Sequence, residues 1–458
     1  MCTFKITNYP HKQDIDTALK LGGPSLTKQI EVDGLYQPLY ITHNLLHVTG
    51  EATPQPVYVG GKYYMLMGEV YNYDKTLASD IYHVINSYEK YGDDFTNYRD
   101  GEFLIVIYDS IKKHIDFFTD PWSTRQAWFH EFDEYFYFGT FPMYEPKNFS
   151  RFSRYPDKDD EWYTKFMRLK HNSHYRYILH PHQNDLIHMN DSLHVWNLDQ
   201  YKNDYKDWDA AFEQAVDKRW HNNMCLHLSG GVDSTCIALC LADLQKHFKS
   251  ITLELTDSED EKTIWATRNY TIPYNENVVI DSPEITREFE TERKRINLNG
   301  RLDNSKSHIT NVYMVEKTKK MNCIVTLKGN GADEIIGNYI NKPNRRSSEQ
   351  LSDPDFTRWP EDLYTIFPWR HFYGGLHRKI LDNNEFYFLA YGIEIRNVYC
   401  DKKLTQEWLN ISSDLKNTEE KSPLKNYLRE RDIVLPTKMA WAGLQARKSL
   451  FKVGSNLL

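Results

Sequence analysis

The most constraining feature of this chain is a buried strand that passes through a glycine-rich turn into a helix. The apolar run Met224–Leu228 predicts the strand, Ser229–Ser234 the turn and Thr235–Leu244 the helix. The same rhythm continues downstream, where strands are predicted at Ile251–Leu255 and Cys323–Leu327. Strands that alternate with helices in this way indicate a doubly wound parallel α/β sheet.

The turn has the chemistry of an anion-binding loop. Its glycines, Gly230 and Gly231, allow the backbone to turn sharply and to approach a ligand closely. The loop N–H groups and the helix N-terminus favour negative charge. The hydroxyls of Ser229 and Ser234 can donate to phosphate oxygens, and Asp233 offers a hard oxygen ligand for Mg²⁺. The loop lacks the lysine of the pattern G-x-x-x-x-G-K-S/T, so it is not a kinase-type phosphate loop.

A second loop of small residues follows the strand predicted at Cys323–Leu327. It has the sequence K-G-N-G-A-D-E over residues 328–334, and a helix is expected to begin near Ala332. Ligands of open α/β sheets collect at the carboxyl ends of the strands. Asp233 and Asp333 are therefore predicted to share one magnesium pyrophosphate. The alternative is an ordinary helix start, in which acidic residues favour the helix dipole.

The two halves of the chain differ in their predicted secondary structure. Residues 1–200 have the pattern of a β-rich domain, and residues 201–458 that of the α/β domain. One helix, Ser79–Tyr91, is predicted in the first half, with Ser79 or Asp80 as its N-cap. The polar stretch Gln200–Asp207 is expected to be a linker. The strands predicted in the first half are Leu39–Val48, Tyr58–Met67, Phe103–Tyr108, His114–Phe118 and Tyr135–Phe138.

Composition excludes several classes of protein. Lys and Arg total 56 and Asp and Glu 64, so the net charge is 56 − 64 = −8, which argues against nucleic acid as a partner. The sequence contains no apolar run of about 18 residues, which is the length that a membrane span needs. The N-terminus lacks the apolar stretch of a signal peptide, so a cytoplasmic location is expected. Cys225, Cys236, Cys240 and Cys323 lie in apolar runs and are expected to be buried.

Both loops resemble those of asparagine synthetases and their β-lactam-forming relatives. These enzymes carry an S-G-G-x-D-S loop, then a G-x-G-S/A-D-E element, then a G-x-E-x-R segment, matched here by residues 392–396, and a C-terminal K-x-x-F, matched by residues 448–451. The resemblance implies an N-type ATP pyrophosphatase (PP-loop) domain that uses ATP and Mg²⁺. It assigns metal binding to Asp233 and Asp333, catalysis to Asp333 and Lys448, and pyrophosphate stabilisation to Lys448. The residues that it assigns to ATP binding are Leu228, Ser229, Gly230, Gly231, Asp233, Ser234, Leu253, Lys328 and Gly329.

One position of the second loop departs from the family pattern. Members usually have an acidic residue between the two glycines, and this carboxylate contributes to the acceptor site. This chain has Asn330 there. The chain therefore lacks the carboxylate that the family pattern places in the acceptor site, and with it a base at this position.

The first half resembles the family's Ntn-type glutamine amidotransferase domain, a β-sandwich flanked by helices. Removal of Met1 would expose Cys2, whose α-amine can act as base for its thiol. Such a nucleophile attacks the side-chain amide of glutamine and releases ammonia. The segments G-E-V-Y-N and S-D match family segments, and the resemblance assigns glutamine binding to Gly68, Glu69 and Asp80.

Two departures bear on this glutaminase site. The family's oxyanion donor, an asparagine, is replaced by Met67, which has no donor. The arginine that clamps the glutamine carboxylate is replaced by Leu45. Cys2 is therefore either a working nucleophile or a relic in a domain that serves as a scaffold or docking surface.

The resemblance implies an ATP-dependent, amide-forming ligase. The expected reaction activates a carboxylate, aspartate by default, as an acyl-adenylate that ammonia then attacks. One alternative uses another amine, as in β-lactam synthetases and lasso-peptide cyclases, and a second is a catalytically inactive binding protein. The expected partners are a small carboxylate and glutamine or ammonia, without nucleic acid or membrane, and a homodimer is left open.

Overall fold

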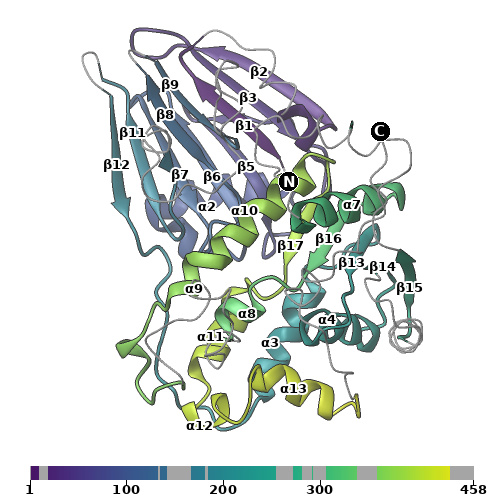
Figure 1. Ribbon diagram of the computed structural model, residues 1–458. Coiled ribbons are helices and arrows are strands. Elements are labelled where there is room, and N and C mark those ends of the chain that lie inside the picture. The colour runs from purple at the N-terminus through teal and green to yellow at the C-terminus, as the bar shows by residue number, and fades with distance from the viewer. Residues whose placement is uncertain are drawn as a thin grey trace. The chain divides into compact units, whose positions relative to one another are not determined.

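The computed structural model describes residues 2–9, 19–132, 135–141, 167–180, 184–253, 272–280, 291, 306–337 and 358–433. The chain divides into two compact units, and each is formed by more than one segment. The first unit comprises Met1–Val195, Glu290–His308 and Asn384–Glu394. The second comprises Trp196–Phe289, Ile309–Asn383 and Ile395–Leu458. Figure 1 shows the elements of both units in chain order.

The first unit is built from two six-stranded sheets whose order is β10-β8-β9-β1-β3-β2 and β12-β11-β7-β6-β5-β4. Neighbouring strands run antiparallel, as in the pairs β1–β3 and β5–β6. The strands are β1 (Thr3–Thr7), β2 (Leu26–Val32), β3 (Leu39–Leu45), β4 (Val57–Val59), β5 (Lys62–Val70), β6 (Gly101–Asp109), β7 (His114–Thr119), β8 (Trp128–Phe132), β9 (Tyr135–Gly139), β10 (Met167–Arg168), β11 (His174–Ile178) and β12 (Asp185–Asn190).

One apolar core joins the two sheets. Phe4 and Ile41 from the first sheet and Met65 and Val106 from the second belong to the same buried cluster. Side chains alternate across a strand, so every second residue of each sheet faces this core. The sequence pattern predicts a β-rich domain, and the arrangement is the β-sandwich that the family resemblance implies.

The helix α2 (Asp80–Tyr91) covers the other face of the second sheet. Its buried residues Ile81, Val84 and Ile85 belong to a cluster with strand residues of β5 and β6, and η1 (Gly92–Tyr98) follows it. Ser79 occupies the N-cap position, but its side chain accepts no capping hydrogen bond. The prediction of a side-chain cap by Ser79 is therefore wrong, whereas the helix itself is confirmed.

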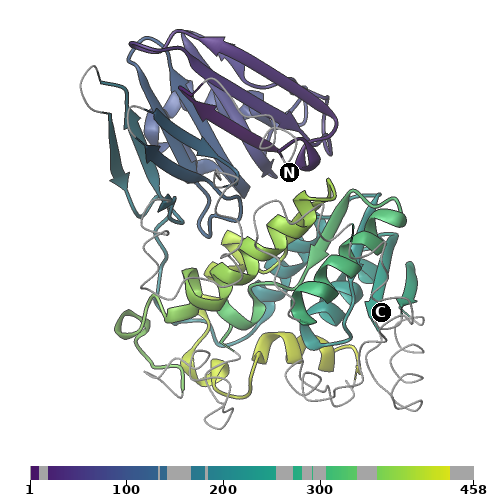
Figure 2. The same cartoon turned by 45° about the horizontal axis from the view of Figure 1, so that its top comes forward.

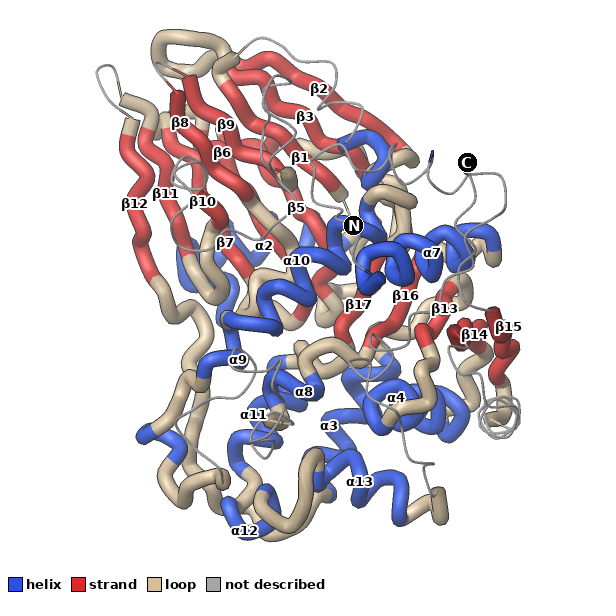
Figure 3. The backbone as a smooth tube through the Cα atoms, viewed as in Figure 1, coloured by secondary structure: helices blue, strands red, loops and turns tan. Residues whose placement is uncertain are grey.

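The second unit contains a five-stranded sheet in the order β15-β14-β13-β16-β17 (Figure 3). The strands β13 and β14, β13 and β16, and β14 and β15 pair in parallel. Sequence order therefore runs outward from β13 in both directions, so the order reverses between β13 and β16. That reversal is the switch point at which doubly wound sheets bind ligands. The bounds are β13 (Met224–His227), β14 (Phe248–Leu253), β15 (Asn275–Ile280), β16 (Val325–Lys328) and β17 (Glu394–Asn397).

The predicted fold class, a β-sandwich domain and a doubly wound α/β domain, is confirmed. The helix α4 follows β13 and packs with α3 and α13, while α7 packs on Cys225 and Ile251 through Met314. The remaining helices are α3 (Lys206–Asp217), α4 (Val232–Asp243), α7 (Lys306–Lys320), α8 (Ala332–Ile335), η4 (Leu363–Thr365), α9 (Arg370–Tyr373), α10 (Gly375–Leu389), α11 (Lys402–Asn410), α12 (Ser413–Lys416) and α13 (Ser422–Arg429). Figure 2 shows them in a second view. Among the described residues, no helix has the length and hydropathy needed to cross a membrane.

The stretch Gln200–Asp207, predicted to be a linker, is fixed in place. Lys202 forms a β-bridge with Ile411, and the Gln200 side chain accepts a hydrogen bond from Lys416 Nζ at 2.7 Å. The last two residues of the stretch already belong to α3. The linker prediction is therefore wrong over this part of the chain, because long-range contacts hold polar residues whose sequence suggests a mobile connection.

Candidate functional site

The loop after β13 forms an anion-binding turn at the start of α4. Gly230 has φ 71°, a left-handed conformation that glycine adopts without strain. The hydroxyls of Ser229 and Ser234 lie 3.2 Å apart, and the N–H of Gly231 donates to Ser229 Oγ at 3.3 Å. The twelve-residue helix that begins at Val232 directs its N-terminal dipole toward this turn. The loop therefore offers hydroxyls, backbone N–H groups and a helix end to one anion.

The loop after β16 brings a second carboxylate to the same edge of the sheet. Glu334 turns back, and its Oε2 accepts the N–H of Gly331 at 3.1 Å, so it caps the short helix α8. Its neighbour Asp333 forms an ion pair instead. A Cβ atom on Gly329 would lie 2.9 Å from Cβ of Asp233, which shows how closely the two loops approach each other.

Lys421 joins the two aspartates, and the sequence analysis missed it. Its Nζ lies 2.5 Å from Oδ1 of Asp233 and 2.5 Å from Oδ1 of Asp333. The lysine side chain is 8% exposed. Burial alone would lower the pKa of Lys421, but the charges of the two aspartates outweigh it and raise this pKa well above its ordinary value. Lys421 is therefore a permanent cation at the point where the two predicted ligand loops meet.

The signal for Lys421 is weak in the sequence. It follows Glu419 and Glu420, a context that favours an ordinary surface charge. In the structure it has φ 55° and directly precedes α13, which begins at Ser422 with a proline in its first turn. Lys421 lies 88 positions after Asp333 in the chain (421 − 333 = 88), and only the fold brings it back to the edge of the sheet.

The donor set of this site fits a magnesium ion. Asp233 and Asp333 provide two carboxylates on adjacent loops, and hard oxygen ligands with phosphate oxygens are what Mg²⁺ prefers. Their side chains are 20% and 31% exposed, so both can reach a ligand. The Tyr399 hydroxyl donates to the backbone oxygen of Asp233 at 2.9 Å and so helps to hold the backbone of Asp233 in place.

The other residues that the resemblance assigns to ATP binding differ in burial and in their place on the sheet. The Leu228 side chain is fully buried, and its backbone oxygen accepts from Thr252 Oγ1 at 2.9 Å. Leu253, the last residue of β14, is partly buried against the cluster around Cys225. Lys328 ends β16, and burial lowers its pKa to about 8. Lys448 lies outside the described residues.

Residues of β17 and of the segment after it have a structural role. Asp401 caps α11 by accepting the N–H of Lys403 at 3.0 Å, and it forms a 2.7 Å ion pair with Arg219. Arg396 Nη1 donates to the backbone oxygen of Arg219 at 3.1 Å. All three side chains are at most 2% exposed. These contacts stabilise the end of the sheet, so we assign the three residues a structural role and not a ligand-binding one.

In the first unit, Cys2 lines a pocket together with Gly68, Glu69 and Asp80. The described residues that line it are Cys2, Leu45, Leu46, His47, Val48, Thr49, Glu51, Thr53, Gln55, Leu66, Gly68, Glu69, Ser79 and Asp80. All the residues predicted for glutamine therefore lie around one pocket. Burial raises the pKa of the Cys2 thiol to about 11, so the thiol is protonated at neutral pH.

The acidic pair of this pocket is held by neutral donors. The N–H of Val70 donates to Asp80 Oδ2 at 3.0 Å, and Thr49 Oγ1 donates to Glu69 Oε2 at 2.5 Å. Burial, and then the charge of Glu69, raise the pKa of Asp80 to about 8. A ligand ammonium group would relieve this repulsion, which agrees with the role that the resemblance assigns to Asp80.

The two departures from the family belong to the apolar core that includes Cys2. Leu45 lines the pocket with Cys2, and Met67, which is 1% exposed, lies in the same buried cluster. Neither replacement can donate a hydrogen bond or supply a positive charge. Neither can therefore act as the oxyanion donor or the carboxylate clamp that glutamine hydrolysis needs.

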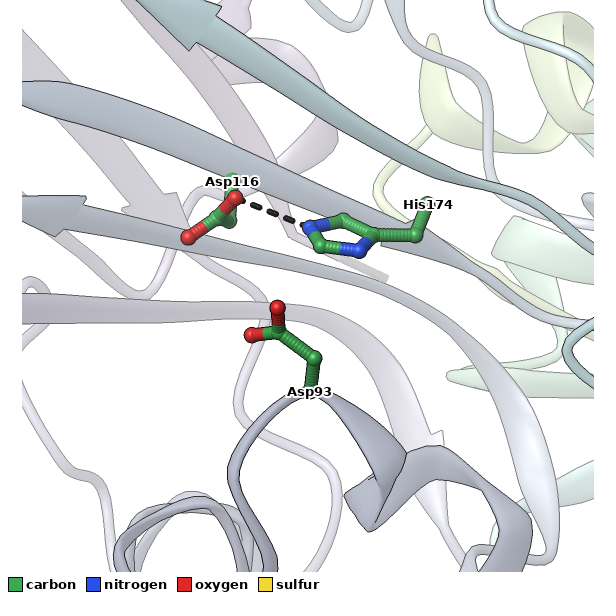
Figure 4. Close-up of side chains that lie close together, drawn as sticks. All are labelled: Asp93, Asp116 and His174. Carbon is green, nitrogen blue, oxygen red and sulfur yellow. Dashed lines mark hydrogen bonds and ion pairs between the residues drawn. The ribbon is translucent and has the colours of Figure 1, made fainter. Parts of the chain in front are cut away.

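A third cluster contains Asp93, Asp116 and His174 (Figure 4). Asp116 Oδ1 lies 2.8 Å from His174 Nε2 and 2.7 Å from Arg176 Nε, and Asp116 Oδ2 lies 3.0 Å from His114 Nε2. The same guanidinium reaches Asp93 at 3.3 Å. We interpret the cluster as an ion-pair network, because Arg176 already supplies the positive charge that a metal ion would bring.

These units define a class of protein: a β-sandwich combined with a doubly wound domain whose switch point carries an anion loop and two aspartates. Comparison with known proteins agrees. Residues 207–385 match the family model described as asparagine synthase. A curated protein of Methanocaldococcus jannaschii named "Putative asparagine synthetase (glutamine-hydrolyzing) 1" is 24% identical over 409 residues, which cover 83% of this chain and 71% of that protein.

Two solved structures have weak likeness to the chain. One is titled the allosteric regulatory enzyme of purine biosynthesis, with 7% identity, a TM-score of 0.30 and coverage of 71% of this chain and 89% of that chain. The other is glutamine phosphoribosylpyrophosphate amidotransferase from B. subtilis, with 7% identity, a TM-score of 0.29 and coverage of 73% and 77%.

Residues 207–385 are thus similar to the asparagine synthase family, and the predicted resemblance to asparagine synthetases is confirmed. This similarity supports an ATP-dependent ligase of the amide-forming kind.

Proposed function

We propose that this protein adenylates a carboxylate, aspartate by default, with release of pyrophosphate, and that an amine then displaces AMP to form an amide. The observation that carries the proposal is the convergence of Asp233 and Asp333 on Lys421 at the switch point of the sheet. A buried cation between two carboxylates on ligand-binding loops suits a site that handles a magnesium polyphosphate.

Each described group has a part in the first step. The Ser229–Ser234 loop binds phosphate oxygens through its hydroxyls and N–H groups. Asp233 and Asp333 would hold Mg²⁺, which neutralises charge on the phosphates when bound. A carboxylate oxygen of the acceptor attacks the α-phosphorus of ATP, and the bond to pyrophosphate breaks. Lys421, and Lys448 by resemblance, stabilise the negative charge that develops on the departing pyrophosphate.

In the second step the nitrogen of the amine attacks the acyl carbon, and the bond to AMP breaks. The amine loses a proton as the amide forms. Positioning of the two reactants in one site accounts for much of the rate, because it replaces an encounter in solution.

Free ammonia suits this chain better than glutamine as nitrogen source. By the resemblance, Leu45 and Met67 replace the carboxylate clamp and the oxyanion donor, and both belong to the buried apolar cluster that includes Cys2. Loss of one such donor typically lowers the rate about 10²–10³-fold. The same replacements favour a second candidate, in which an amine other than ammonia attacks the acyl-adenylate. The intact Ser229–Ser234 loop and both aspartates argue against an inactive binding protein.

The test is pyrophosphate release from magnesium ATP and aspartate, with ammonium chloride compared with glutamine. We expect release with ammonium and at least about 10²-fold less with glutamine. An Asp233→Ala variant serves as the control and should release no pyrophosphate with either. Equal rates with glutamine would contradict the assignment of Leu45 and Met67, and full activity of the Asp233 variant would contradict the proposed site.

A further inference from the structure

The pocket that Cys2 lines is rich in carboxylates. Glu51, Glu69 and Asp80 belong to its described lining, and that lining contains no lysine or arginine. Burial first, and then the charges of Glu69 and Glu394, raise the pKa of Asp80, so these carboxylates lie close enough to repel one another. Burial also raises the pKa of the Cys2 thiol, and the positive charge of the amino terminus offsets this only in part. The pocket therefore holds more negative charge than its surroundings balance.

The guanidinium nearest to this pocket is engaged by other carboxylates. Arg125 lies behind Gly68, because a Cβ atom added to that glycine would come within 2.9 Å of Arg125 Nε. Arg125 is 1% exposed and pairs with Glu102 at 3.8 Å. Burial would lower the pKa of Arg125, but the charges of Glu102, Glu394 and Glu385 outweigh it and raise this pKa. This cation is therefore neutralised where it lies and does not offer a partner to a ligand carboxylate.

Polar groups of the lining can accept hydrogen bonds from one ligand. Asp80 accepts the N–H of Val70 at 3.0 Å, and Glu69 accepts the hydroxyl of Thr49 at 2.5 Å. A carboxylate has about four acceptor positions, so both can accept further bonds. Ser79 is 5% exposed and lines the same pocket, and its hydroxyl neither caps α2 nor has another hydrogen-bond partner among the described residues. An ammonium group, which has three N–H donors and no acceptor, complements this set.

The apolar part of the lining suits a carbon chain and not a second charged group. Cys2, Leu45, Leu46 and Leu66 are all buried. A carboxylate that leaves water for such surroundings needs a cation or several N–H donors in return. In this pocket it would also be repelled by the acidic side chains of the lining. A ligand that has an ammonium group and no carboxylate avoids both costs.

We infer that this pocket binds a primary amine that carries no carboxylate, through Asp80, Glu69 and Ser79, in preference to a free amino acid such as glutamine. The ligand's ammonium group lies against the two carboxylates and the serine hydroxyl, and its carbon chain lies against the leucines. The inference concerns the first unit alone and does not rest on the proposed adenylation.

The experiment is isothermal titration calorimetry of the full chain, without ATP, with ligands that differ by one group. L-Glutamine carries both charged groups, 4-aminobutanamide lacks its carboxylate, and glutaramic acid lacks its ammonium group. We expect 4-aminobutanamide to bind at least about tenfold more tightly than glutamine, and glutaramic acid not to bind measurably. Leu45→Arg adds a cation to the apolar wall and should shift the preference toward glutamine by about tenfold or more.

Two further variants test the residues that accept from the ammonium group. Ser79→Ala should weaken the binding of 4-aminobutanamide about threefold or more and leave Tm unchanged, because this hydroxyl makes no capping bond. Asp80→Asn removes a charge and should weaken this binding about tenfold or more. Asp94→Asn makes the same change at an exposed position of η1 outside the described lining, and binding should stay within about twofold.

Several outcomes would overturn the inference and leave the adenylation standing. They are equal or tighter binding of glutamine, binding of glutaramic acid as tight as that of the amine, and no binding of 4-aminobutanamide. Wild-type affinity in both the Ser79→Ala and Asp80→Asn proteins would also overturn it. The comparison of ligands needs no variant, so it decides the preference even if Leu45→Arg or Asp80→Asn does not fold.

Discussion

Replacement of Lys421 by methionine is expected to lower ATP–pyrophosphate exchange about 10²–10³-fold, because it removes a cation that stabilises charge on the phosphates. The lysine lies 2.5 Å from both aspartates, so the variant also leaves two carboxylates facing each other. Their repulsion should weaken nucleotide binding, and both kcat and KM are expected to change.

Lys425→Met is the matched control for this substitution. Lys425 lies one turn further along α13, its side chain is 36% exposed, and it pairs with Glu419 at 3.3 Å. Its replacement should change the exchange rate less than about twofold, as is usual for a surface ion pair. Lys421→Arg keeps the positive charge and should retain more activity than the methionine variant. A Lys421→Met protein that is folded by circular dichroism and exchanges at the wild-type rate would contradict the role assigned to this lysine.

Asp116→Asn is expected to cost the first unit about 3 kcal/mol of local stability, because it leaves the partly buried Arg176 guanidinium beside an uncharged side chain. The aspartate is fully buried, and His114, His174 and Arg176 all contact its carboxylate. Hydrogen exchange measured by mass spectrometry on peptides from β7 and β11 should accelerate about 10²-fold in the intact protein. Asp93→Asn is the control: this side chain is 45% exposed, and exchange should accelerate only a few-fold. Unchanged exchange in the Asp116 variant would contradict the network.

The same network predicts how the first unit responds to acid. Burial would raise the pKa of Asp116, but hydrogen bonds from His114, His174 and Arg176 hold it well below its usual range. The folded pKa therefore lies below the unfolded value of about 3.9, and the contribution of Asp116 is fully present at neutral pH. It is lost only as the pH falls below about 4.

The sheets could be predicted from the sequence because their strands are short apolar runs bounded by turn residues. Met224–Leu228 has the apolar composition of a strand buried on both faces, and a glycine turn with a helix follows it, so a parallel sheet was foreseeable. The continuous apolar run Phe103–Tyr108 likewise predicted a strand. The linker prediction for Gln200–Asp207 was wrong, because the fate of this stretch depends on contacts with distant residues. Ser79 occupies the N-cap position, but without the side-chain bond that its residue type favours.

The sequence predicted only those site residues that lie on loops with a recognisable ligand-binding pattern. Ser229, Asp233 and Asp333 follow strands, and strand ends meet at one edge, so their proximity could be inferred from the topology. Lys421 belongs to no strand and lies among acidic residues, so nothing local distinguishes it from a surface lysine. The partner of Asn330 was also out of reach, because Asn397 lies 67 residues further along the chain.

We infer that the Asp233–Asp333 site cleaves ATP between its α- and β-phosphates. The most direct measurement is analysis of the nucleotide products after incubation with magnesium ATP, ammonium chloride and L-aspartate. We expect AMP and pyrophosphate in equal amounts, and the loss of both in an Asp333→Asn variant. Formation of ADP and phosphate, no carboxylate-dependent turnover, or undiminished AMP formation by the variant would contradict the inference.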